Sequence, residues 1–110
     1  MAYIDFLSAN HSKTKRDYLA RVNDPEFPKA RAAELAKGWG FDYWDGDRKI
    51  NYGGYKYIDG FWSDVVEDFI SFYNLNNQSS ILDVGCGKGF TLFDFCKKIP
   101  EMRIRGLEYS

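Results

Sequence analysis

The residues best suited to chemistry lie in one stretch, Ile81–Phe90, which reads Ile-Leu-Asp-Val-Gly-Cys-Gly-Lys-Gly-Phe. A short apolar run containing Asp83 leads into Gly85, Gly87 and Gly89, and a helical pattern follows. A strand that passes through a glycine-rich turn into a helix presents backbone N–H groups and a positive helix end to a polar ligand. Glycine suits such a turn because it adopts positive φ and lets a ligand approach the backbone closely. The stretch therefore predicts a ligand-binding turn.

The spacing of the glycines separates three kinds of ligand. A dinucleotide fingerprint, G-x-G-x-x-G, requires glycine at the position that Phe90 occupies. A phosphate-binding P-loop, G-x-x-x-x-G-K-[ST], requires a hydroxyl residue after Lys88, where Gly89 stands instead. The pattern that remains is D-x-G-x-G-x-G, with Asp83 two places before the first glycine.

This pattern resembles the first motif of class I S-adenosylmethionine-dependent methyltransferases. The resemblance implies that S-adenosylmethionine is the cofactor and that the turn runs along its methionine part. It also implies that an acid at the position of Asp83 interacts with the cofactor's amino group. The turn residues that the resemblance assigns to cofactor binding are Gly85, Cys86, Gly87 and Gly89.

A second acid completes the motif near the end of the chain. Met102–Leu107 is predicted to be a short strand, and Glu108 follows it. An acid about 20 residues beyond a glycine turn can accept hydrogen bonds from the ribose hydroxyls, and the resemblance assigns this role to Glu108. Taken alone, Glu108 would be interpreted as a solvated residue at a strand end.

The function implied by the resemblance is methyl transfer from S-adenosylmethionine to an acceptor that the sequence does not identify. A small molecule, such as a sugar-type substrate of bacterial biosynthesis, is one candidate acceptor. The main task of the protein would be to position and desolvate the reactants, and no catalytic residue is assigned. The alternative is a non-catalytic, Rossmann-like binding module that uses its aromatic segment to bind a partner.

The aromatic segment runs from Phe41 to Trp62 and contains Asp-Gly and Gly-Gly turn signals. Its tyrosines and tryptophan combine a stacking face with a hydrogen-bonding tip, which suits a substrate pocket. The other interpretation is that these rings pack the segment onto the rest of the protein. The candidate substrate residues are Trp44, Tyr52, Tyr55 and Tyr57.

The predicted fold class is α/β, as the start of a Rossmann-like class I methyltransferase sheet with a first strand, a helix and a second strand. Residues 1–80 are predicted to form an N-terminal helical and aromatic cap, and residues 81–110 an incomplete first β-α-β unit. Strong helix formers predict a helix over Pro28–Lys37, ended by Gly38 or Gly40. Apolar residues at intervals of three and four predict a second helix over Trp62–Tyr73.

The composition of the chain limits the kinds of partner that it is expected to bind. Fifteen basic and sixteen acidic residues give a net charge of -1, which indicates neither nucleic-acid binding nor attraction to an anionic membrane. A single histidine predicts no zinc site. Two cysteines, Cys86 and Cys96, favour reduced thiols in a cytoplasmic protein.

The C-terminal residues predict an incomplete domain, because the last residue, Ser110, lies only two positions after Glu108. We expect the chain to be the N-terminal part of a longer enzyme or a naturally shortened relative. Two parallel strands leave unpaired edges, so we also expect this chain alone to self-associate and to bind the cofactor weakly or not at all.

Overall fold

The computed structural model describes residues 3–14, 18–22, 24–26, 28–47 and 56–109. The chain divides into two compact units. One, here called the sheet unit, comprises residues 1–14 and 58–109, and the other, the helical unit, comprises residues 15–57. The predicted division after residue 80 stays a prediction.

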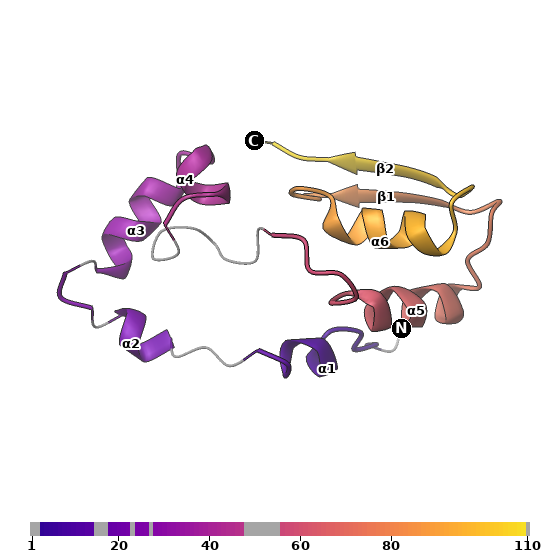
Figure 1. Cartoon of the computed structure of the whole chain (residues 1–110), viewed down its shortest axis with the longest axis horizontal. Helices are drawn as coiled ribbons and strands as arrows, with labels where there is room; N and C mark the ends of the chain where they lie inside the picture. Colours follow the sequence, from indigo (N-terminus) through magenta and orange to yellow (C-terminus); the bar gives the residue numbers. More distant parts are fainter. Residues whose placement is uncertain (1–2, 15–17, 23, 27, 48–55, 110) are drawn as a thin grey trace. The chain divides into compact units, whose positions relative to one another are not determined.

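The sheet unit contains three helices and two strands among its described residues: α1 (Ser8–His11), α5 (Ser63–Tyr73), β1 (Ser80–Val84), α6 (Phe90–Lys98) and β2 (Arg103–Leu107). The two strands are parallel, with Ile81 opposite Ile104 and Asp83 opposite Gly106. Helix α6 connects the strands and lies along the sheet, with α5 beside it (Figure 1). Parallel strands require such a crossover because a tight hairpin cannot join them.

A small apolar core lies between the two helices and one face of the sheet. Val66 from α5, Phe95 from α6 and Met102 before β2 are buried. The rings of Phe69 and Phe95 make an edge contact with their centroids 6.1 Å apart. The partly buried residues that complete this core are Phe69, Ile70, Leu75, Ile81, Ile99 and Ile104.

The opposite face of the sheet is exposed. Leu82 and Val84 on β1 are 59% and 76% exposed, and Leu107 on β2 is 57% exposed. Burial alternates along β1, so Ile81 and Asp83 share the covered face while Leu82 and Val84 do not. Among the described residues of the sheet unit, helices therefore cover one face of this parallel pair and not the other.

The predicted fold class is wrong. The sheet formed by the described residues has two strands in the order β1-β2, and this order does not show a Rossmann-like sheet. The physical reason is that the glycine pattern specifies a local strand, turn and helix, whereas strand order depends on contacts across the whole sheet. The individual elements do appear close to their predicted bounds, since Met102–Leu107 becomes β2 and Trp62–Tyr73 becomes α5.

The helical unit contains α2 (Tyr18–Val22), α3 (Lys29–Ala36) and α4 (Phe41–Trp44). Helix α3 matches the helix predicted over Pro28–Lys37, with Pro28 at its N-cap. The helix ends at Ala36, with Lys37 as its C-cap, just before Gly38. Beyond the helix, Trp39 takes a left-handed φ of 52°, and its ring lies against that of Tyr43 with the centroids 4.7 Å apart.

Candidate functional site

The glycine turn between β1 and α6 requires its glycines for conformational reasons. Gly85, Gly87 and Gly89 have φ angles of 82°, 56° and 76°, in the left-handed region that costs other residues about 1–2 kcal/mol. A Cβ added at Gly85 or Gly89 would meet no atom within 4 Å. The turn therefore exposes bare backbone at these two positions, where a ligand can approach closely.

The backbone donors of the turn are largely used inside the protein. The carbonyl of Leu107, at the end of β2, accepts hydrogen bonds from Gly85 N–H (2.7 Å) and Cys86 N–H (3.1 Å). The N–H of Gly89 donates to the carbonyl of Cys86 at 2.9 Å. The sequence predicts that the turn offers its N–H groups to a ligand, but at these three positions they hold the turn together and fix it to β2.

Glu108 lies against the same turn. Its Oε2 accepts a hydrogen bond from Gly87 N–H at 2.8 Å, and its Oε1 accepts one from Tyr109 N–H at 3.1 Å. The two acids and the glycines that the sequence selected are thus brought to one end of the sheet. The carboxylate of Glu108 is thus held at the turn by two backbone donors.

Asp83 is the second acid of the site. It is half-buried on the covered face of β1, opposite Gly106. Within the part of the chain that the structure describes, its carboxylate makes no hydrogen bond or ion pair. The site therefore combines two carboxylates with bare glycine backbone, and it suits a ligand that carries a positive charge and hydroxyl donors better than an anion.

Gly106 is a site residue that the sequence analysis missed. A Cβ at this position would lie 2.5 Å from Cys86 Sγ and 2.9 Å from Leu92 Cδ1. Only glycine lets the turn and the start of α6 pack this closely on β2. The available signal was a glycine inside a predicted strand, which often marks a close approach of backbone.

The candidate substrate residues are only partly described. Tyr52 and Tyr55 lie outside the described residues, whereas Trp44 and Tyr57 are half-buried in the helical unit. Trp44 makes an edge contact with Tyr43, with ring centroids 4.9 Å apart. Trp44 thus packs within its own unit, and its role toward a substrate stays a prediction.

Cys86 and Cys96 are free thiols. A search of the described residues finds no group of three or more His, Cys, Asp or Glu side chains able to hold a metal ion. No helix in the described ranges is both long and apolar enough to cross a membrane.

Comparison of the chain with protein-family models, with curated proteins and with solved structures found no match. The proposal below therefore depends on the chemistry of the turn and its two acids.

Proposed function

We propose that the glycine turn binds S-adenosylmethionine and that the protein takes part in methyl transfer to a small-molecule acceptor. The observation that carries this proposal is the hydrogen bond from Gly87 N–H to Glu108, 2.8 Å long. It holds an acid beside the glycine turn, at the position that the resemblance assigns to binding the ribose hydroxyls.

The charge of the site favours this ligand over a nicotinamide dinucleotide. A pyrophosphate needs backbone donors and a positive environment, but Gly85, Cys86 and Gly89 donate within the protein. The acids offer acceptors to the two ends of the proposed ligand, Asp83 to an ammonium group and Glu108 to the ribose. A sulfonium cation is also favoured near two carboxylates.

The residues have separate tasks in the proposed complex. Gly85 and Gly89 leave room for the ligand against the backbone, while Glu108 orients the ribose. When bound, S-adenosylmethionine would supply an electrophilic methyl group to a nucleophilic atom of the acceptor, with S-adenosylhomocysteine as the product that leaves. Among the described residues, we assign none as the base that would take a proton from the acceptor.

The test is a titration of the 15N-labelled 110-residue protein with S-adenosylhomocysteine and, separately, with NAD. We expect S-adenosylhomocysteine to shift the amide resonances of Gly85, Gly87, Gly89 and Tyr109, and NAD to leave them in place. Glu108→Ala should weaken the interaction by about 1–3 kcal/mol, the scale for losing hydrogen bonds to a charged group.

A matched control is Glu101→Ala, which removes another exposed carboxylate of the same unit, one that accepts a hydrogen bond from Asn77. This variant should bind S-adenosylhomocysteine like the original protein. Shifts with NAD alone, or no shift at the turn with either compound, would contradict the proposal.

A further inference from the structure

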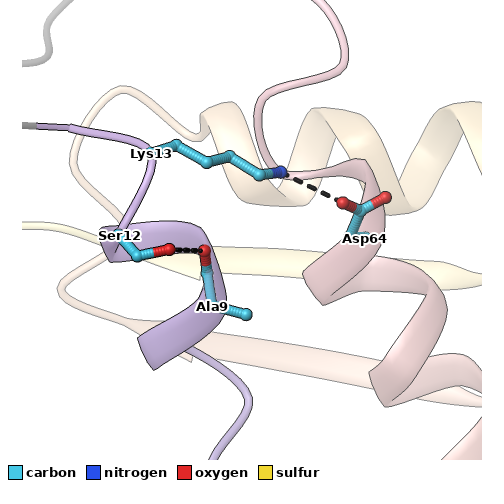
Figure 2. Close-up of polar contacts among 4 residues, drawn as sticks. All are labelled: Ala9, Ser12, Lys13 and Asp64. Carbon is cyan, nitrogen blue, oxygen red and sulfur yellow. Dashed lines mark hydrogen bonds and ion pairs between the residues drawn. The ribbon is translucent and has the colours of Figure 1, made fainter.

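The N-terminal segment Tyr3–Thr14, here called the cover, lies against α5. Its main contact is the ring of Phe6, whose centroid is 4.2 Å from that of Phe69 and 5.7 Å from that of Phe72. Short helix α1 belongs to the cover, and Figure 2 shows it beside the start of α5. Phe6 therefore anchors the cover to the apolar side of α5.

The rest of the contact between the cover and α5 leaves polar side-chain atoms buried without hydrogen-bond partners. Asn10 in α1 is 2% exposed, and neither its Nδ2 nor its Oδ1 has a hydrogen-bond partner among the described residues. Burying an amide without partners lowers the equilibrium constant for docking by roughly five- to one-hundred-fold. The sequence gives no sign of this, because asparagine in a short polar helix is usually solvated.

A small hollow of about 40 Å³, partly open to solvent, lies between the cover and the start of α5. Phe6, Asn10 and Lys13 line it from the cover, and Asp64, Val65 and Asp68 line it from α5. Residues around a void lose the dispersion contacts that close packing provides. The hollow is thus a second, independent sign that the cover docks imperfectly.

One ion pair ties the end of the cover to α5. Lys13 Nζ lies 3.0 Å from Asp64 Oδ2, as Figure 2 shows, and these side chains are 44% and 74% exposed. Ion pairs that are this exposed contribute little to stability, and salt screens them. Helix α1 has four residues, too few to be stable when undocked.

We propose that the cover is releasable: it detaches from α5 and unfolds while the core of the sheet unit stays folded, and added salt favours the detached form. Phe6 holds the docked state, while Asn10 and the hollow weaken it. Detachment exposes the side of α5 that carries Val65 and Phe69.

Hydrogen exchange of the 110-residue protein tests this proposal. In α1, His11 N–H donates to the Leu7 carbonyl (2.9 Å) and Ser12 N–H to the Ser8 carbonyl (3.0 Å). These amides should be at least about 100-fold less protected than the amide of Ile99 at the end of α6, because local opening exchanges only the cover. Equal protection in α1 and α6 would overturn the proposal.

Two variants should shift the equilibrium between the docked and the detached cover in opposite directions. Asn10→Leu removes the buried amide and fills space, so it should slow exchange of the α1 amides by roughly tenfold. Phe6→Ala should abolish their protection while Ile99 keeps its own. His11→Leu is the control, because it makes a similar change in helix propensity at an exposed position. If Asn10→Leu slows exchange no more than His11→Leu does, the unsatisfied amide does not govern release.

Discussion

Gly106→Ala is the substitution that most directly tests how the glycine turn is held on β2. The added Cβ would lie 2.5 Å from Cys86 Sγ, 3.2 Å from Cys86 Cβ and 2.9 Å from Leu92 Cδ1. Real Cβ atoms essentially never approach this closely, so the turn or the strand must move. Leu92 is 9% exposed, and the N–H of Cys86 donates a hydrogen bond to the Leu107 carbonyl on β2. Neither residue can therefore move away easily to make room for the added Cβ.

The expected loss of stability can be estimated from these contacts. Overpacking of this kind costs about 1–3 kcal/mol, and alanine regains up to about 1 kcal/mol over glycine inside a strand. We therefore expect Gly106→Ala to lower the free energy of unfolding by about 1–2 kcal/mol. Displacement of Cys86 should also lengthen the hydrogen bond between Gly87 and Glu108, so affinity for S-adenosylhomocysteine should fall as well.

Urea unfolding of a double-mutant cycle measures this effect. Cys86→Ala removes the sulfur atom but not the Leu92 contact, so it should rescue part of the loss, with a coupling of about 0.5–1 kcal/mol. Gly40→Ala is the control for glycine replacement itself, because a Cβ there would meet only the Gly38 carbonyl at 3.9 Å. A neutral Gly106→Ala, or a cycle without coupling between Gly106 and Cys86, would refute the packing argument.

Three further predictions concern the sheet unit. Hydrogen bonds from the Ser8 side chain and from the backbone N–H groups of Ser8 and Leu7 lower the pKa of Asp5, so Asp5 stabilises α1 above its ordinary pKa. The protection factors of the α1 amides, which correct the exchange rates for their intrinsic pH dependence, should therefore fall as the pH falls through the lowered pKa, and Asp5→Asn should remove this dependence. Val84→Lys, which places a charge on the exposed sheet face, should reduce self-association measured by sedimentation, and unchanged association would show that this face is not involved. Lys98→Met, which breaks the exposed ion pair with Glu67, should change the urea midpoint by the equivalent of at most about 1 kcal/mol, so a larger loss would reveal a tertiary role.

The local elements of the sheet unit could be predicted from the sequence because short-range chemistry determines them. Apolar spacing defines α5, and positive-φ glycines between a strand and a helix define the turn. The distance along the chain from the turn to Glu108 also suffices to place this acid near the glycines, since a single β-α-β crossover returns the second strand beside the first. The closeness of Gly87 and Glu108 follows from this connection.

Tertiary structure decided four features that the local sequence does not determine. Among the described residues, the sheet has the strand order β1-β2, because strand pairing depends on contacts that the glycine pattern does not specify. The turn's N–H groups donate to Leu107 and within the turn rather than all remaining for a ligand, because the end of β2 lies within hydrogen-bonding distance. The need for glycine at position 106 and the cost of Asn10 arise only when distant segments pack together, since each is set by atoms that are far away in the sequence.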